Sequence, residues 1–450
     1  MIFQFFWHKV CLYFRNMTLY TILHTLWSIV GIIYVLRGSF SPASAWAWSL
    51  AMIIAPPIST LALWLTRCRT TFSPRCSHAP HYNRLQRSIA TLALGELTTR
   101  NHITALHNAE QTYTSLIRDL QHARREIIFE FYIIDDDHIG STILALLCRR
   151  ARSGVKVKII YDAVGSWRLS KKSIITLKHS GIELQRFGPP RFPYLSPDLH
   201  RRNHRKIVLI DREILYVGGI NIASRYLGKS KLGYWRDDHI RIEGEAAQKA
   251  IRQIAPTLKD SFRRRTTASL CPMQFIYPAQ QSPTIAMQYI FQEAFSSARH
   301  SIRISTPYFL PPASLLDSIC SAAQCGVEVT LIIPSRSDIA LIDCGSMPSL
   351  RRAVASGVKL FRYRDGFLHS KVIIIDDSTS IIGSANMDYR SLRYNLEAAA
   401  VVYNKGLARH YTEQFMQDVA HSTAVAPRDL RSSFLGRIKE GAAQLIAPLL

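Results

Sequence analysis

The feature that most constrains this chain is an internal repeat. The segment ARREIIFEFYII, which begins at Ala123, resembles ARHSIRISTPYFL, which begins at Ala298. In the same order, SGVKVKIIYD from Ser153 resembles CGVEVTLIIPS from Cys325, and SGIELQRF resembles SGVKLFRY farther along each copy. We therefore expect two similar halves, related by an approximate twofold axis. Active sites often form at the interface between such halves.

Helix-like and strand-like segments alternate within the repeat. Residues 110–125 and 141–153 have the spacing of helices, whereas the apolar runs 127–134 and 155–161 are typical of buried strands. This alternation predicts the α/β class. The expected architecture is two similar α/β halves with pseudo-twofold symmetry.

Each half also carries the same polar residues at the same spacing. In the first half they are His204, Lys206, Asp211, Gly219 and Asn221, and in the second they are His369, Lys371, Asp376, Ser384 and Asn386. Corresponding residues lie 165 positions apart. The probability that two such copies arise by chance is negligible. The histidines, lysines and aspartates are candidate catalytic residues. The asparagines, with Gly219 and Ser384, are candidates for binding substrate phosphate.

These residue types suit chemistry at a phosphodiester. Two imidazoles, two ammonium groups and two amides around one centre match a tetrahedral phosphate with two substituents. One histidine can attack phosphorus and carry a phosphohistidine, while the other protonates the leaving alkoxide and later deprotonates the incoming hydroxyl. The lysines and asparagines can neutralise charge on the non-bridging oxygens of the transition state. This scheme requires neither a metal ion nor another cofactor.

The acidic residues divide into two groups. Asp211 and Asp376 lie seven residues after the histidines, so on a continuous strand they face the opposite side. A structural role at the following turn is the favoured alternative to catalysis for these two. Asp237 and Glu397 lie downstream of the asparagines, and either could accept a hydrogen bond from an imidazole and fix its tautomer.

The N-terminal region is strongly apolar. Residues 19–36 and 45–65 contain no Lys, Arg, Asp or Glu, and each is long enough to cross a bilayer. They predict a transmembrane hairpin, with a kink in the second span at Pro56 and Pro57. A signal peptide is the alternative. The distribution of arginine and lysine places both ends of the hairpin, and everything after residue 66, in the cytoplasm.

Composition narrows the partners and the compartment. Lys and Arg exceed Asp and Glu by 24, which indicates an anionic partner. The excess is concentrated in residues 1–100 and 201–265, so an anionic bilayer and an anionic lipid explain it better than nucleic acid. The eight cysteines are scattered without a CxxC pair, which favours free thiols over a zinc site.

The two HxKxxxxD…G[GS]xN motifs resemble those of the phospholipase D superfamily. The apolar hairpin, the segments HRKIVLIDREILYVGGINIASRY and YWRDDHIRIEG, and HSKVIIIDDSTSIIGSANMDYRSLRYNLEAAAVVY resemble bacterial cardiolipin synthases more closely. The resemblance implies that two phosphatidylglycerols react to give cardiolipin and glycerol through a phosphatidyl-histidine. It assigns His204 and His369 as the nucleophile and acid pair, and Asp237 and Glu397 as the family's downstream acids.

The resemblance also suggests a domain plan. We expect a membrane hairpin over 1–66, a basic linker over 67–100, and phospholipase D-like domains over 101–265 and 266–450. The expected location is the bacterial inner membrane, as a multi-pass protein with a cytoplasmic catalytic part. The run from Arg263 to Arg265 could contact anionic headgroups, or be an ordinary solvated loop. The amphipathic tail over 434–450 could contact lipid, although packing on the protein's own core is favoured.

Two other functions remain open at this point. A hydrolytic phospholipase D would use the same site with water as the acceptor, and sequence does not distinguish the two. A nuclease would also fit the basic charge, but two membrane spans argue against it. A lipid-binding protein without activity conflicts with two intact motifs.

Overall fold

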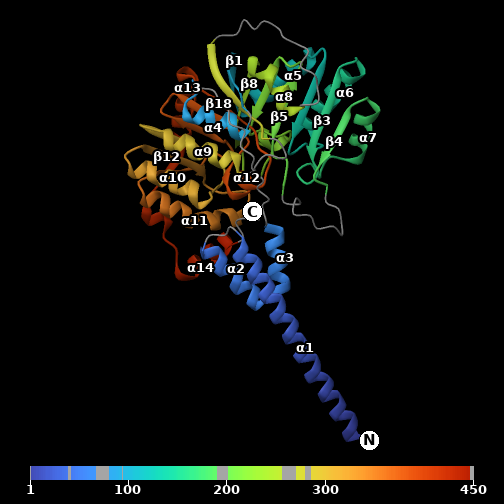
Figure 1. Ribbon diagram of the computed structural model, residues 1–450. Coiled ribbons are helices and arrows are strands. Elements are labelled where there is room, and N and C mark those ends of the chain that lie inside the picture. Colours follow the sequence, from blue (N-terminus) through green and yellow to red (C-terminus); the bar gives the residue numbers. More distant parts are fainter. Residues whose placement is uncertain are drawn as a thin grey trace. The chain divides into compact units, whose positions relative to one another are not determined.

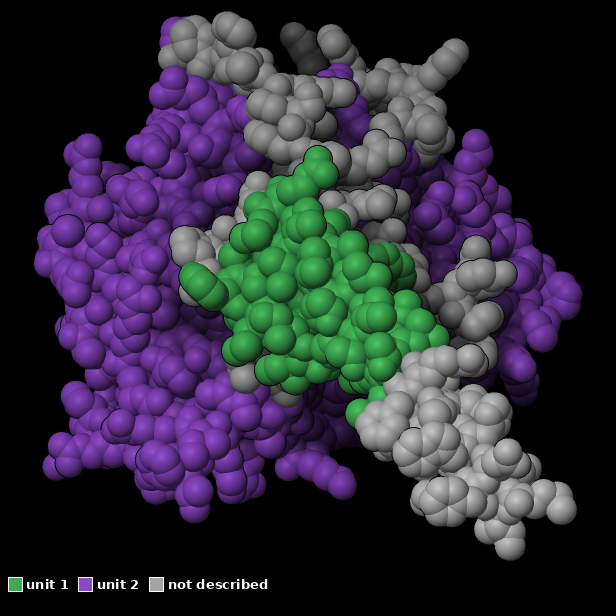
Figure 2. Space-filling view, turned by 60° about the horizontal axis from the view of Figure 1, so that its bottom comes forward, with its two compact units in different colours: residues 1–68, 195–197 green, residues 69–194, 198–450 purple. Residues whose placement is uncertain are grey.

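The computed structural model describes residues 2–38, 42–66, 81–93, 95–189, 201–255, 270–278 and 285–445. The chain divides into two compact units (Figure 2): unit 1 comprises residues 1–68 with 195–197, and unit 2 comprises 69–194 with 198–450. The run Arg263–Arg265 lies outside the described residues, as does most of the predicted linker over 67–100.

Unit 1 contains three apolar helices, α1 (Ile2–Arg37), α2 (Pro42–Ile54) and α3 (Pro56–Thr66). Ser28 Oγ donates to the Met52 carbonyl at 2.8 Å, and Trp27 Nε1 donates to Thr60 Oγ1 at 3.0 Å, so α1 packs against both others. Within the described residues, one helical segment, Met17–Arg37, is long and apolar enough to cross a membrane, with a mean hydropathy of 1.8.

The second predicted span does not form one continuous helix. It is divided at Ala55, immediately before Pro56 and Pro57. Proline lacks the amide hydrogen that an uninterrupted helix needs and clashes with the preceding turn. The interruption lies where the kink was expected, and the span is formed by two helices, α2 and α3.

Unit 2 is built on a single mixed sheet (Figure 1). In its first half the strands are β1 (Leu97–His107), β2 (Glu126–Phe131), β3 (Lys156–Asp162), β4 (Glu183–Phe187), β5 (Lys206–Ile210), β6 (Ile214–Gly218) and β8 (Asp238–Gly244). In the second half they are β9 (Leu270–Ile276), β10 (Ser301–Ser305), β12 (Glu328–Pro334), β13 (Lys359–Tyr363), β15 (Val372–Ile375), β16 (Thr379–Gly383), β18 (Ala399–Val402) and β19 (Ser422–Val425).

The strand order reveals the repeat in three dimensions. Outward from the centre, the first half runs β1-β8-β6-β5-β2-β3-β4, and the second runs β9-β18-β16-β15-β10-β12-β13, followed by β19. β1 and β9 pair antiparallel and join the halves. Two short pairs lie apart from this sheet: β7 (Trp235–Arg236) with β14 (Phe367–Leu368), and β11 (Phe309–Leu310) with β17 (Met387–Asp388). Two similar α/β halves were therefore predicted correctly.

Helices cover the sheet. They are α4 (Arg84–Ala93), α5 (Asn108–His122), α6 (His138–Arg152), α7 (Lys171–His179), α8 (Glu245–Ile254), α9 (Ala286–Ser297), α10 (Ala313–Gln324), α11 (Ala340–Ala355), α12 (Tyr389–Arg393), α13 (Lys405–Ala420) and α14 (Phe434–Leu445). Short 3-10 turns span Ser224–Leu227 and Pro427–Leu430. The helices and strands predicted between residues 110 and 161 are confirmed as α5, β2, α6 and β3.

The central strands are apolar on both faces because each face has its own core. In β5, Val208 and Ile210 pack into a cluster with residues of α5 and α6. Ile207 and Leu209 point the other way, into a cluster that also holds Ile374 of β15 and residues of α8 and α13. This second cluster draws side chains from both halves, so the halves share a core.

Part of the predicted linker is folded. α4 buries Leu85, Ile89 and Ala93 against the second-half core, which includes Met287 and Ile290 of α9. β1 begins at Leu97, before the expected domain start at residue 101. The linker was predicted from the basic residues of this region, and the apolar residues of α4 at helical spacing were overlooked. The domain boundary between residues 265 and 266 falls outside the described residues and stays a prediction.

The predicted amphipathic tail forms α14. Its inner face packs on α11, where Glu440 accepts a hydrogen bond from Arg351 at 2.5 Å and Ala443 is buried beside Gly345. Phe434, Leu435 and Ile438 remain exposed. Packing on the protein's own core is therefore confirmed for one face of the helix.

Candidate active site

The two motif histidines occupy equivalent positions in the sheet. His204 lies just before β5, and its amide donates to the carbonyl of Leu396 in the second half at 2.9 Å. His369 lies just before β15, and its amide donates to the carbonyl of Arg236 in the first half at 2.7 Å. Each histidine is thus anchored by the backbone of the opposite half.

Each imidazole also contacts a carboxylate of the opposite half. Glu397 Oε1 lies 2.9 Å from His204 Nδ1, and Asp237 Oδ2 lies 2.6 Å from His369 Nδ1. Because an ionised carboxylate can only accept, it places the ring proton on Nδ1. Nε2 of each ring is then left with a lone pair for chemistry.

The lysines of the motif are buried with the histidines. Lys206 Nζ donates to the carbonyl of His204 at 2.6 Å, and Lys371 Nζ donates to the carbonyl of His369. Lys371 Nζ also lies 2.8 Å from His369 Nδ1 and 3.6 Å from Asp237 Oδ2. A strand places residues two apart on one face, which explains why each lysine accompanies its histidine.

Burial controls the protonation of the site. It lowers the pKa of Lys206 to about 7, an effect that Glu397 opposes and Lys371 reinforces. Burial also lowers the pKa of His204, and it lowers that of His369 well below its ordinary value, with the charges of Lys371, Lys206 and His204 adding to the effect. Burial raises the pKa of Asp237 to about 6, against the opposing charge of Lys371. Burial and the neighbouring cations therefore oppose positive charge on these lysine and histidine side chains.

The two motif asparagines are not equivalent. Asn221 Oδ1 accepts from the amide of Ile133 at 3.1 Å, and its Nδ2 donates to the hydroxyl of Tyr226 at 2.8 Å. Asn386 hydrogen-bonds to the carboxyl of Asp388, but its buried Oδ1 has no hydrogen-bond partner within the described part of the chain. Both polar atoms of the Asn221 amide therefore have a protein partner, whereas Oδ1 of Asn386 has none within the described residues.

Gly219 and Ser384 differ because the two carboxylates differ. A Cβ atom on Gly219 would lie 2.1 Å from Asp237 Oδ1, so only glycine fits beneath this carboxylate. Ser384 Oγ instead donates to Glu397 Oε2 at 2.5 Å and accepts from the amide of Ala398 at 2.9 Å. Both positions contact the acids that bind the histidines.

Asp211 and Asp376 bond to backbone amides rather than to the histidines, which supports the structural role favoured for them. Asp211 accepts from the backbone amides of residues 124, 125 and 126, and Asp376 from those of 299, 300 and 301. Both lie in tight turns with a φ of 51°. Each lies seven residues after its histidine, which along an extended strand of about 3.3 Å per residue corresponds to roughly 23 Å. They hold the start of β2 and of β10.

Sequence reasoning missed the aromatic wall of the site. The Tyr226 hydroxyl lies 3.5 Å from His369 Nδ1, and the Tyr132 ring meets His204 edge to face, with centroids 4.9 Å apart. Tyr226 follows Asn221 by five residues in INIASRY. The matching position in the second half is Ser391, so the repeat gave no signal for this tyrosine.

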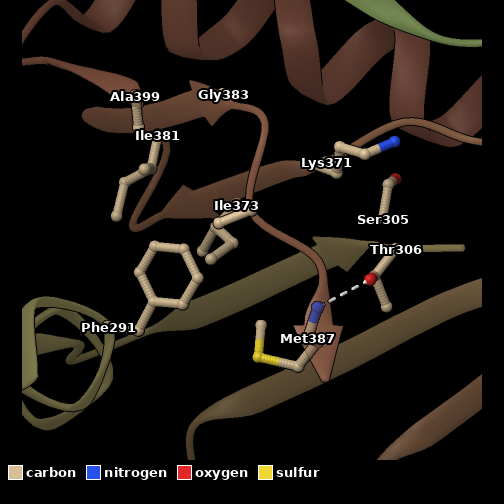
Figure 3. Close-up of a pocket in the computed structure, with 10 residues that line it drawn as sticks. Phe291, Ser305, Thr306, Lys371, Ile373, Ile381, Gly383, Met387 and Ala399 are labelled. Carbon is tan, nitrogen blue, oxygen red and sulfur yellow. Dashed lines mark hydrogen bonds between the residues drawn. The ribbon is translucent and has the colours of Figure 1, made fainter. Parts of the chain in front are cut away.

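A small space adjoins Lys371 (Figure 3). Ser305, Thr306, Phe291 and Met387 are among the residues that line it, and its volume of about 10 Å³ is sufficient for about one water molecule. Thr306 Oγ1 accepts from the amide of Met387 at 3.1 Å. Among the described residues, no group of three or more His, Cys, Asp or Glu side chains could hold a metal ion.

Comparison with known proteins places this site in a family. A family model described as "Cardiolipin synthase, PLD-like domain" matches residues 116–254 and 291–419. The cardiolipin synthase of Staphylococcus aureus is 36% identical over 368 residues, covering 79% of this chain and 74% of its own. That of Geobacillus kaustophilus is 34% identical over 393 residues, covering 84% and 78%.

A solved structure supports the fold. The phosphatidylserine synthase of Haemophilus influenzae superposes with a TM-score of 0.64 at 16% identity, covering 82% of this chain and all of its own. At this identity the likeness concerns the fold alone. The family match spans both halves and includes both motifs, and two relatives exceed 30% identity. The chain therefore belongs to the cardiolipin synthase family, whose members carry the phospholipase D-like domain.

Proposed function

We propose that this protein transfers a phosphatidyl group from one phosphatidylglycerol to another, giving cardiolipin and glycerol. The observation that carries the proposal is the reciprocal pairing of His204 with Glu397 and of His369 with Asp237. It supplies two oriented imidazoles, each with an available Nε2, at the interface of two phosphodiester-type motifs. The names of the relatives supply the lipid substrate class.

In the first step, Nε2 of His204 attacks phosphorus and the bond from phosphorus to the glycerol headgroup oxygen breaks. His369, protonated at Nε2, gives its proton to this oxygen and glycerol leaves. Burial lowers the pKa of His369. The negative charge of a bound phosphodiester acts in the opposite direction and favours the protonated acid.

In the second step, neutral His369 takes the proton from a glycerol hydroxyl of the second phosphatidylglycerol. The resulting oxygen attacks phosphorus, the bond from phosphorus to His204 breaks, and cardiolipin forms. Lys206 and Lys371 neutralise charge on the non-bridging oxygens in both steps. The unused Oδ1 of Asn386 is suited to accept a hydrogen bond from the attacking or leaving glycerol hydroxyl, and Asn221 positions Tyr226.

We also propose a location for this chemistry. The apolar segment Met17–Arg37 supports anchoring in the bacterial inner membrane. The excess of positive charge supports contact with anionic lipid rather than nucleic acid. Basic residues on both flanks of the N-terminal helices support a multi-pass topology with a cytoplasmic site.

Product analysis tests the reaction. Full-length protein in vesicles of radiolabelled phosphatidylglycerol is expected to give cardiolipin and free glycerol in equal amounts, with or without a chelator. His204→Ala and His369→Ala should each abolish turnover, whereas the exposed His179→Ala serves as the matched control. Phosphatidic acid as the sole lipid product would replace the synthase with a hydrolase. Normal activity in either active-site variant would exclude the two-histidine mechanism.

A further inference from the structure

A cavity of about 400 Å³ lies in the second half, beneath α11. Its volume falls in the range of small-molecule sites, which is about 300–1,000 Å³. The buried side chains of Phe309, Ile333, Ile342 and Leu350 contribute to its walls. The lining is therefore mixed: apolar side chains form much of the wall, and Asp343 and Arg362 contribute polar groups.

The cavity adjoins the candidate active site through one short segment of chain. Ser305 and Thr306 face the small space beside Lys371, as Figure 3 shows, and the next three residues, 307–309, line the cavity. Thr306 Oγ1 donates to the Tyr308 carbonyl at 2.9 Å and accepts from the Met387 amide, which fixes the segment. A ligand that reaches Lys371 thus lies one segment away from the cavity.

The rim of the cavity is apolar where the chain enters α11. Ala340 lines the cavity, and its neighbours Ile339 and Leu341 have 42% and 38% of their surfaces exposed. Exposed apolar side chains beside an apolar hollow suit an apolar ligand. A purely polar headgroup would gain little from such a rim.

The burial of the two histidines explains why the enzyme needs such a cavity. His204 and His369 have only 9% and 6% of their surfaces exposed, so the reacting phosphate must enter below the protein surface. The diacylglycerol part is attached to that phosphate and is drawn toward the protein with it. Part of each acyl chain is then drawn out of its hydrocarbon surroundings, and a nearby apolar cavity can replace these surroundings for the distal part of one chain.

We propose that this cavity binds an acyl chain of the phospholipid substrate while the phosphate lies between the histidines. The proposal rests on the function proposed above, because it assumes a lipid substrate at that site. It adds a separate subsite, formed by α11 and residues 307–309, that recognises the chain rather than the headgroup.

Filling the cavity tests the proposal. Ala340→Trp places an indole at the rim, and Ala313→Trp is the matched control, because Ala313 is likewise the exposed first residue of a helix and does not line the cavity. The substrates are dioleoyl and dihexanoyl phosphatidylglycerol in mixed micelles. For Ala340→Trp we expect the KM for the dioleoyl lipid to rise about tenfold at unchanged kcat, the pattern of lost substrate binding, with little change for the dihexanoyl lipid.

The possible results separate the two proposals. Equal KM increases for both lipids would overturn the acyl-chain assignment and point to headgroup binding. Identical kinetics of Ala340→Trp and Ala313→Trp would show that the cavity does not bind substrate. Failure of the unmodified protein to form cardiolipin would instead overturn the proposed function.

A binding experiment on unmodified protein does not depend on the variants. Phosphatidylglycerol with a diazirine at the end of one acyl chain should label peptides that contain Met347 or Leu350, both of which line the cavity. Excess unlabelled dioleoyl lipid should suppress this labelling. Labelling confined to other peptides would contradict the proposal.

Discussion

At the scale of single residues, the site depends on close packing around its carboxylates. Gly219 lies directly beneath Asp237, which in turn contacts His369. A methyl group there must displace the carboxylate, and with it the imidazole. The conformational freedom of glycine is not the reason for this residue, because the missing side chain is what the structure requires.

Gly219→Ala is therefore expected to lower kcat by about 10²-fold, the usual effect of a misplacement of about 1 Å at a reacting group. Steady-state kinetics on phosphatidylglycerol would measure it. Gly441→Ala is the control, since no atom lies within 4 Å of the added Cβ and alanine favours the helix. Retention of full activity in Gly219→Ala would show that Asp237 does not position His369.

The carboxylate of Glu397 should also be visible in the pH dependence. Burial lowers the pKa of His204, and Glu397 opposes this by stabilising the protonated ring. Glu397→Gln removes the opposing charge, so the pKa of His204 falls further. If His204 must be neutral to attack, the acidic limb of kcat/KM moves to lower pH while the plateau falls. A pH profile measures both, with the exposed Glu413→Gln as control. A shift of the limb to higher pH would refute this assignment.

The motif residues stand out in the sequence because each type occurs twice at one spacing. It could not predict which acid contacts which histidine, because that pairing crosses between halves and depends on the final packing. It likewise gave no sign that both polar atoms of the Asn221 amide bind Ile133 and Tyr226, whereas Oδ1 of Asn386 has no partner within the described residues. Because both copies of the motif contain asparagine at this position, the two residues had been expected to play the same role.

At the scale of elements, the seam between β1 and β9 joins the halves. Asn101 is fully buried there, and its Nδ2 donates to the Cys271 carbonyl of β9 at 2.9 Å. Its Oδ1 accepts from the Ala246 amide of α8 at 2.8 Å. One amide thus ties together two strands and a helix.

Asn101→Ala should lower the free energy of unfolding by about 3 kcal/mol, because it leaves a buried carbonyl and a buried amide without this partner. Asn83→Ala, at the exposed start of α4, removes a helix cap and should cost about 1 kcal/mol. Urea denaturation of the detergent-solubilised protein compares the two. Equal losses would show that the seam does not depend on Asn101.

Some elements were harder to predict than others. β5 and β15 were clear from IVLI and VIII, since apolar runs between polar motifs are typical of buried strands. α4 was not expected, because its basic neighbours suggested a linker, although Leu85, Ile89 and Ala93 have helical spacing. The short pairs β7–β14 and β11–β17 have two residues in each strand, too few to leave a periodic pattern.

At the scale of the whole molecule, the proposed topology makes a prediction about access. Cys325 is exposed at the end of α10 and should face the cytoplasm. An impermeant maleimide added to intact spheroplasts should therefore not label it. After permeabilisation the unmodified protein should gain a label that the Cys325→Ser variant lacks. Arg37→Cys, between the predicted spans, should be labelled in intact spheroplasts. Labelling of Cys325 before permeabilisation would reverse the orientation.

Each repeat supplies the carboxylate that contacts the histidine of the other repeat, so the two repeats depend on each other. A substitution at Glu397 in the second repeat is felt at His204 in the first, and a substitution at Asp237 is felt at His369. A fragment that kept only the first repeat would retain His204 but lack its acid, and would need a second copy of itself to regain one. The chain thus resembles a dimer fused into one polypeptide. A substitution that inactivates one repeat is expected to inactivate the other as well.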